Sequence, residues 1–227
     1  MTAQTLFVTG TDTGIGKTRI AVALLHGLRA AGFSAVGYKP VASGCEATSA
    51  GLRNEDALAL QAASTPGWDY GAINPIALAE PIAPHIAAAE AGVTIDTEVL
   101  DDGHARLAAA SDWVVVEGAG GWHVPLRARV DFADWVGGHG WPTLLVVGMR
   151  LGCVNHAVLS ARAIAAATPF IGWIANTLPP IQPRLEENIA CLEQAIAAPL
   201  CARVACDARA DLALNPAPWF VRMNRRE

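Results

Sequence analysis

The sequence lacks the features by which several classes of protein are recognised. It has 16 basic against 21 acidic residues, so its net charge of −5 gives no electrostatic reason to expect binding to nucleic acid or an anionic membrane. No uninterrupted apolar run reaches the ~20 residues of a membrane span. No charged segment with an apolar run behind it precedes the first strand, so no signal peptide is expected. We therefore expect a cytoplasmic protein that binds neither nucleic acid nor membrane.

Cysteine is scarce, and its spacing excludes the common structural uses of this residue. The five cysteines form no C-x-x-C pair and have no histidines at zinc-like spacing, so we expect reduced thiols. The six histidines pair with no serine or cysteine in a recognisable nucleophile motif. The sequence therefore does not indicate a covalent enzyme nucleophile.

Apolar residues, by contrast, are abundant. They make up 52% of the 227 residues, and charged residues make up only 16%. This balance suits a parallel sheet that is buried on both faces. The length suffices for one α/β domain and is short for two. We expect a single domain over residues 1–227, in which the tail after about residue 208 is poorly determined by the sequence.

The strongest local signal is Val8–Thr18, with the sequence VTGTDTGIGKT. It follows an apolar strand at Thr5–Val8 and leads into a helix from Arg19. A strand, a Gly-rich turn and Gly-Lys-Thr at a helix start are typical of triphosphate binding, because backbone N–H groups and the helix dipole face the phosphates. Lys17 would reach the β- and γ-phosphates, and Thr18 would ligate Mg²⁺. The pattern predicts a P-loop NTPase-type α/β fold, a parallel sheet flanked by helices on both faces.

This loop departs from the strict P-loop pattern at one position. Thr11 stands where the pattern has glycine, and Gly10 lies one place earlier. The dinucleotide fingerprint G-x-G-x-x-G is not met either, because Arg19 follows Gly14 and Gly16. The alternative is a tight turn whose lysine is merely solvated. The strand before the loop and the helix after it favour phosphate binding.

The second signal is an apolar run that ends in an acid and then glycines. Trp113–Val116 is expected to be a buried strand, and Glu117 follows it, before Gly118, Ala119 and Gly120. In P-loop proteins an acid at this place holds Mg²⁺ directly or through water. The alternative, a carboxylate at a strand end facing solvent, would not explain glycines that let a ligand come close. We expect this segment to form the second half of the phosphate site.

Two further loops carry candidate site residues. A strand expected at Ser34–Tyr38 leads into a loop with Lys39 and Ser43, and a helix is expected over Arg53–Ala63 with Asp56 near its start. Loops at the carboxyl ends of parallel strands converge on one rim, so Lys39 and Ser43 should face the same crevice as the Gly-rich turn. Lys39 could equally be an ordinary surface lysine, and Asp56 could simply favour the helix dipole.

Apolar periodicity predicts the remaining elements. Strands are expected at Pro142–Val147, Phe170–Asn176 and Leu200–Val204. Helices are expected at Pro84–Glu90, Thr97–Ala110, Asp131–Val136, Leu151–Ala167 and Pro183–Ala197. The Pro- and Gly-rich segment from Pro66 to Pro84 is expected to be a long excursion between elements.

Several motifs, taken in order, resemble the dethiobiotin synthetase family. They are Gly10–Thr13 with Gly16–Thr18, Tyr38–Gly44, Gly51–Asn54 with Asp56–Leu58, Glu80–Pro81 with Pro84–His85, Glu117–Gly121, Leu151–His156 and Gly172–Asn176. Any one alone is a weak signal, but the ordered set is highly specific. The resemblance implies an ATP-dependent cyclo-ligase that converts 7,8-diaminononanoate and CO₂ to dethiobiotin. The reaction would pass through an N-carbamate and a carbamic-phosphoric anhydride, and it would release ADP and phosphate.

The resemblance also implies residue roles. Lys17 would neutralise the transferring phosphoryl group, Lys39 would hold the carbamate, and Asn176 would read the adenine edge. The ATP site would comprise Thr13, Gly14, Ile15, Gly16, Lys17, Thr18, Asp56, Glu117, Gly118, Ala119, Gly120 and Asn176. The substrate would be bound by Thr11, Lys39, Ser43 and Asn155, and Mg²⁺ by Thr18, Asp56 and Glu117. The family is dimeric, so we expect a homodimer with the substrate site at its interface.

Three positions depart from the family pattern. Gly14 stands where relatives often carry a carboxylate, Arg150 replaces an expected lysine, and Val204–Asp207 lacks an expected proline beside the adenine. Two alternatives remain. A P-loop ATPase switch of the partitioning type usually carries an extra lysine near the start of the loop, and positions 10–16 contain none. Another ligase on the same fold, such as an amidotransferase relative, would need a glutaminase domain for which 227 residues leave no room.

Overall fold

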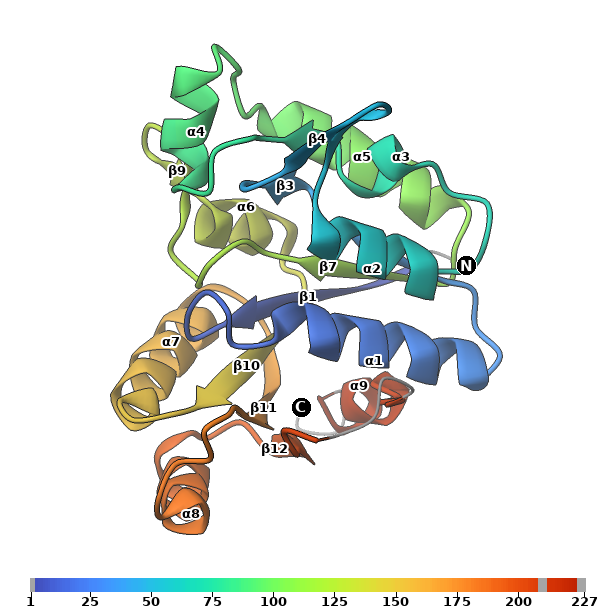
Figure 1. The fold of residues 1–227 in the computed structure, drawn as a ribbon. Helices are drawn as coiled ribbons and strands as arrows, with labels where there is room; N and C mark the ends of the chain where they lie inside the picture. Colours follow the sequence, from blue (N-terminus) through green and yellow to red (C-terminus); the bar gives the residue numbers. More distant parts are fainter. Residues whose placement is uncertain (1–2, 208–211, 224–227) are drawn as a thin grey trace.

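A sheet of six parallel strands forms the centre of the computed structural model, which describes residues 3–207 and 212–223 (Figure 1). The strand order is β12-β11-β10-β1-β7-β2, and every neighbouring pair is parallel. The strands are β1 Gln4–Gly10, β2 Ala35–Tyr38, β7 Trp113–Glu117, β10 Thr143–Met149, β11 Phe170–Thr177 and β12 Leu200–Val204. The predicted parallel sheet is confirmed. Part of the tail, residues 208–211 and 224–227, lies outside the described residues.

Burial explains why these strands could be recognised in the sequence. Every residue of β7 and β10 is buried, and so is β1 from Thr5 onward. A parallel sheet with both faces covered needs near-continuous apolar runs rather than alternating ones. The runs ending at Val8, Val116 and Val147 meet this requirement.

Helices cover both faces of the sheet (Figure 1). On one face α1 packs against α2 and against β1, β2 and β7, and on the other α7 packs against α6, β10 and β11. The helices are α1 Lys17–Ala30, α2 Glu55–Ala63, α3 Tyr70–Ile73, α4 Pro84–Glu90, α5 Thr97–Ala109, α6 Phe132–His139, α7 Cys153–Ala167, α8 Leu185–Ala195 and α9 Ala217–Met223. All the helices expected between residues 53 and 197 are present, with ends shifted by a few residues.

The sequence analysis missed the shortest elements. The additional pairs are β3 Val41–Ala42 with β6 Ile76–Ala77, β4 Glu46–Thr48 with β5 Gly51–Arg53, and β8 Pro125–Arg127 with β9 Val130–Asp131. The segment after Tyr38, predicted as a loop, therefore contains a short strand, and α3 and α9 were not predicted. Strands of two or three residues show no periodicity of their own, and β3 exists only because the chain brings β6 beside it.

Two expectations concern the chain as a whole. Among the residues that the structure describes, no helix is long and apolar enough to cross a membrane. That residues 1–227 form one domain stays a prediction.

Candidate active site at the carboxyl edge of the sheet

Three adjacent strands bring the predicted site residues to one edge of the sheet. β1, β7 and β2 are neighbours. Glu117 ends β7, Lys39 directly follows β2, and Lys17 begins α1 after the loop that follows β1. A cavity of about 790 Å³ opens at this edge. The predicted residues in its wall are Thr13, Gly14, Gly16, Lys17, Thr18, Lys39, Ser43, Asp56, Glu117, Ala119 and Gly120. Parallel strands explain this convergence, because their carboxyl ends share one edge.

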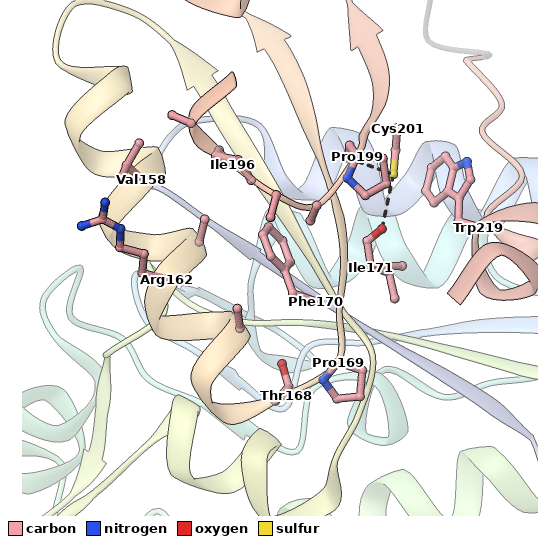
Figure 2. Close-up of a pocket in the computed structure, with 15 residues that line it drawn as sticks. Val158, Arg162, Thr168, Pro169, Phe170, Ile171, Ile196, Pro199, Cys201 and Trp219 are labelled. Carbon is pink, nitrogen blue, oxygen red and sulfur yellow. Dashed lines mark hydrogen bonds between the residues drawn. The ribbon is translucent and has the colours of Figure 1, made fainter. Parts of the chain in front are cut away.

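A second cavity, of about 580 Å³, lies against α7 and the starts of β11 and β12 (Figure 2). Its wall is mainly apolar and includes Val158, Phe170, Ile196 and Trp219. None of the predicted site residues lines it. Because strand starts and strand ends lie at opposite edges of a parallel sheet, this cavity is remote from the phosphate loop. The predicted site residues that line a cavity therefore all belong to the first one.

The phosphate loop uses its glycines differently from the strict pattern. A Cβ on Gly10 would lie 2.7 Å from Cδ1 of Ile15, so Gly10 lets the buried Ile15 side chain close under the loop. Thr11 is not among the residues with positive φ, so the residue at this position need not be glycine. Gly14 and Gly16 do adopt left-handed φ values, of 70° and 87°. Ile15 is fully buried, so its side chain supports the loop from below.

The start of α1 is suited to binding an anion. Gly16 caps the helix without a side-chain hydrogen bond, and the first turn contains no acidic residue. The first N–H groups of a helix have no partner within it, so they suit phosphate. Lys17 is buried, and its Nζ donates to the carbonyl oxygen of Asp12 at 2.9 Å. Burial, together with the nearby Lys39 ammonium, lowers the pKa of Lys17 to about 8.

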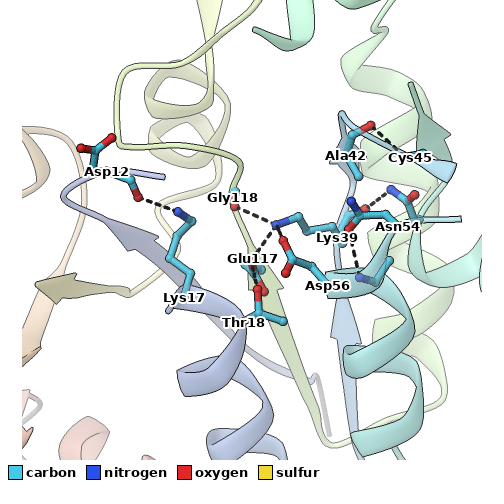
Figure 3. A network of polar contacts seen from close by, with 12 residues as sticks. Asp12, Lys17, Thr18, Lys39, Ala42, Cys45, Asn54, Asp56, Glu117 and Gly118 are labelled. Atoms are coloured by element: carbon cyan, nitrogen blue, oxygen red, sulfur yellow. Dashed lines mark hydrogen bonds and ion pairs between the residues drawn. The ribbon is translucent and has the colours of Figure 1, made fainter. Parts of the chain in front are cut away.

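Lys39 is the centre of a network of charges (Figure 3). Its Nζ donates to Oε1 of Glu117 at 2.6 Å and to Oδ2 of Asp56 at 3.0 Å. The Thr18 hydroxyl donates to the same Glu117 oxygen at 2.9 Å. Lys39 and Glu117 are buried, whereas the Asp56 side chain is 37% exposed. The structure thus joins the three predicted metal-binding residues to Lys39.

The carboxylates keep Lys39 charged despite its burial. Burial alone would lower the pKa of Lys39, but Glu117 and Asp56 outweigh it and raise this pKa above its ordinary value. Burial alone would raise the pKa of Asp56, but the Lys39 ammonium and the Thr18 hydroxyl lower it. Lys39 is consequently a buried cation whose charge is balanced by two carboxylates.

Side chains that the sequence analysis did not single out position this network. Asn54 caps α2 by accepting from Ala57 N at 3.2 Å, which fixes Asp56 in the first turn. Asn74 donates to the carbonyl oxygen of Lys39 at 2.7 Å. Asparagine before a helix is a recognisable cap, so Asn54 had a sequence signal. Asn74 had none, because it lies 35 residues from Lys39 in the sequence.

The residues present fit a magnesium ion. Oε2 of Glu117 is buried and has no hydrogen-bond partner among the residues described. The other oxygen of this carboxylate accepts from the Thr18 hydroxyl, and Lys39 links Glu117 to Asp56. Carboxylate and hydroxyl oxygens are the ligands that Mg²⁺ prefers. Within residues 3–207 and 212–223 no group of three or more His, Cys, Asp or Glu residues could hold a metal on its own. This matches Mg²⁺ sites that take one or two carboxylates from the protein and the rest from substrate phosphates.

Asn176 lies beneath the phosphate loop rather than in the cavity wall. It is 1% exposed, and its Nδ2 donates to the carbonyl oxygen of Ile15 at 2.7 Å. A Cβ on Gly16 would lie 2.3 Å from this nitrogen, so only glycine fits there. Oδ1 of Asn176 accepts from Arg19 at 3.4 Å. Asn176 supports the loop in this structure, and its contact with adenine stays a prediction.

Four more predicted residues are absent from the cavity wall, and one of them is Ile15, which is buried under the loop. Asn155 is exposed in the first turn of α7, and Thr11 and Gly118 are set back from the wall. The Gly118 carbonyl oxygen accepts from Lys39 at 3.4 Å. The substrate contacts of Asn155 and Thr11 stay predictions. Arg150, which replaces an expected lysine, pairs with the carboxylate of Asp12 beside the loop.

Part of the cavity wall is apolar. It is formed by Ala42, Pro81, Ile82, Pro84 and Val124. Three of these residues come from the segment expected to be an excursion between elements. The motif around Pro81 and Pro84 was the only sequence signal that pointed to them.

Comparison with known proteins identifies a family model and close relatives of the chain. A family model described as an AAA domain matches residues 4–209. The chain is 56% identical over 205 residues to the ATP-dependent dethiobiotin synthetase BioD of Xanthomonas oryzae pv. oryzae (strain PXO99A), covering 90% of this chain and 92% of the relative. It is 53% identical over 195 residues to the ATP-dependent dethiobiotin synthetase BioD 1 of Salmonella typhi, covering 86% of each.

A solved structure shows the same fold at low identity. The ParA family ATPase from Chlorobium tepidum TLS superposes with a TM-score of 0.53 at 17% identity, covering 90% of this chain and 85% of that one. A likeness at this level concerns the arrangement of the sheet and helices. It supports the predicted P-loop NTPase-type fold.

Proposed function

The chain belongs to the ATP-dependent dethiobiotin synthetases, and we propose that the cavity at the carboxyl edge of the sheet is where its reaction takes place. The enzyme is an ATP-dependent ligase that forms dethiobiotin from 7,8-diaminononanoate and CO₂. The observation that carries the location is the convergence of Lys17, Thr18, Lys39, Asp56 and Glu117 on one cavity. The use of ATP as a substrate supports a cytoplasmic location.

The first chemical step suits the two lysines. One amine of the diamine adds to CO₂ and loses a proton, which gives a carbamate. A carbamate oxygen then attacks the γ-phosphorus, and the bond to the ADP oxygen breaks. Negative charge gathers between carbamate and phosphates, so fixed cations stabilise the transition state. Lys17 would meet the phosphoryl oxygens, and Lys39 would turn from Glu117 and Asp56 to hold the carbamate.

Ring closure needs positioning more than further catalytic groups. The second amine attacks the carbamate carbon, phosphate leaves, and the amine proton is lost. Thr18, Asp56 and Glu117 would hold Mg²⁺, which supplies positive charge at the phosphates when it is bound. Ser43, in the cavity wall, would hydrogen-bond the substrate. The apolar wall around Ile82 and Val124 suits the aliphatic chain of the nonanoate.

Product analysis tests this proposal. The protein would be incubated with ATP, Mg²⁺, the diamine and bicarbonate, and the products identified by mass spectrometry. We expect the cyclic urea, ADP and phosphate in equal amounts, and little phosphate when either the diamine or bicarbonate is omitted. Rapid phosphate release without the diamine, and without any urea, would instead favour a P-loop ATPase switch.

We also propose that a second copy of the chain completes the substrate site. Asn155 lies at the start of α7, and Leu159 follows on the same helical face, since positions four apart are neighbours. Leu159 is 58% exposed and the preceding Leu151 is 96% exposed, so this region offers apolar surface for a homodimer. The N–H groups at the helix start and the Asn155 amide suit the carboxylate of the substrate.

Mixing two inactive variants tests this arrangement. Lys17→Ala and Asn155→Ala proteins should each have low activity alone. After subunit exchange half the dimers are hybrid, and each hybrid has one intact site, so roughly a quarter of the wild-type activity should return if the sites act independently. Demonstrated exchange without any recovery would place Asn155 and Lys17 of one site in the same subunit.

A further inference from the structure

Arg19 connects three segments beside the phosphate loop. It lies in the first turn of α1, directly after Thr18. One guanidinium nitrogen donates to Oδ1 of Asn176 at 3.4 Å, at the end of β11. The other donates to the carbonyl oxygen of Ala205 at 2.9 Å, just after β12. The side chain thus bridges two acceptors that come from neighbouring strands.

The Asn176 acceptor has a fixed direction. Its Nδ2 is committed to the carbonyl oxygen of Ile15, so Oδ1 must point the other way, toward Arg19. The Ala205 carbonyl is a second acceptor directed at the same guanidinium. Two acceptors that converge in this way would pair with a group that offers two N–H donors.

This step rests on the proposed function, in which ATP binds at the phosphate loop. The nucleobase of that ATP would reach the two acceptors. The phosphates would lie on the loop, and the β7–β2 side of the loop is taken by Lys39, Asp56 and Glu117. Sugar and base therefore extend to the other side, over the ends of β11 and β12. This is the side on which Arg19 contacts Asn176 and Ala205.

We propose that Arg19 is a specificity-determining residue for the nucleobase. The 6-amino group of adenine must compete with the guanidinium for Asn176 Oδ1 and Ala205 O. A 6-keto group gains nothing from these two acceptors, but it accepts a hydrogen bond from Arg19 itself. The enzyme consequently discriminates weakly between ATP and ITP, in which a keto group replaces the 6-amino group and N1 becomes an N–H donor instead of an acceptor.

The test compares ATP with ITP in dethiobiotin formation by wild type, Arg19→Leu and Arg19→Lys. Arg19 also carries charge near the phosphates, so the ratio of the two kcat/KM values is the measurement, because this ratio cancels any effect common to both nucleotides. We expect a ratio within about threefold of one for wild type, and an ATP preference larger by about five- to tenfold for Arg19→Leu, the gain of one net hydrogen bond. Arg19→Lys should fall between them, because one ammonium nitrogen replaces the two guanidinium nitrogens that face the two acceptors.

Arg162→Leu is the matched control, since it removes the same charge from the remote apolar cavity. It should leave the ratio unchanged. Binding of ADP and IDP, measured by calorimetry, should show the same order. A wild-type enzyme with a strong ATP preference, or an Arg19→Leu ratio equal to wild type, overturns the role of Arg19. Absence of dethiobiotin with every nucleotide would instead overturn the proposed function.

Discussion

The two buried lysines of the cavity have opposite surroundings. Lys17 donates a hydrogen bond to a backbone carbonyl. Its pKa is lowered to about 8 because the nearby carboxylates do not offset the effect of burial. Lys39 contacts two carboxylates, which raise its pKa although it is equally buried. The difference suits Lys17 to an anionic ligand, whereas Lys39 already has protein counter-ions. The burial of Lys17 therefore destabilises the ligand-free protein, whereas the ion pairs of Lys39 stabilise it.

Removal of Lys39 should have the largest effect on stability. Lys39→Met leaves the buried Glu117 without its counter-ion, and breaking a buried pair in this way costs about 3–5 kcal/mol of unfolding free energy. Denaturation with urea at pH 7 measures the loss. The double variant Lys39→Met/Glu117→Gln should recover most of it, because no buried charge is then uncompensated. Equal stability of Lys39→Met and wild type would show that the ion pair of Lys39 with Glu117 does not stabilise the fold.

Removal of Lys17 should act mainly on catalysis. Under the proposed function, Lys17→Met removes the cation expected to face the growing phosphoryl charge, so kcat should fall by the equivalent of about 2–4 kcal/mol. The affinity for the diamine should change less, because Lys17 lies in the phosphate loop. Steady-state kinetics with each substrate varied in turn separates the two effects. A normal kcat for Lys17→Met would contradict the role of the loop.

The same variant should make the free protein more stable at pH 7. Since the pKa of Lys17 is lower in the folded chain than the ordinary 10.5, the unfolded chain binds this proton more tightly. The loss of folding stability caused by the protonated, buried Lys17 develops as pH falls from 10.5 to 8 and is complete below 8. Its size is at most about 3 kcal/mol. Denaturation of wild type and Lys17→Met at pH 7 and pH 10 should show a stability difference that shrinks at the higher pH.

Replacement of the acids should have a smaller effect, through the metal. Glu117→Gln and Asp56→Asn should each raise the Mg²⁺ concentration that gives half-maximal activity, by about tenfold or more for the buried Glu117 and by less for the partly exposed Asp56. Calorimetric binding of ADP with and without Mg²⁺ gives a readout that does not depend on turnover. Ser43→Ala serves as a control in the same cavity. An unchanged Mg²⁺ titration for both acid variants would remove them from the metal site.

The elements that the sequence predicted well are those with a long local signal. Buried strands such as β7 and β10 are continuous apolar runs, and α1 follows directly from a Gly-rich turn. The short pair β3–β6 and the helix α9 had no such signal, because their stability depends on distant partners. Similarly, the phosphate loop was recognised from eleven consecutive residues, Val8–Thr18, whereas the side-chain contacts of Arg19 could not be.

The sequence alone determined the chemistry that the chain carries, since a P-loop, an acid after a strand and a lysine after another strand are local patterns whose convergence follows from a parallel sheet. Only the tertiary structure decided how these groups are paired. Lys39 was predicted to hold the carbamate, and the fold places its ammonium between Glu117 and Asp56. Asn176 was predicted to read adenine, and the fold places its amide under Ile15 and against Arg19. Pairings of this kind depend on distances between segments far apart in the chain, and no local pattern of residue types encodes them.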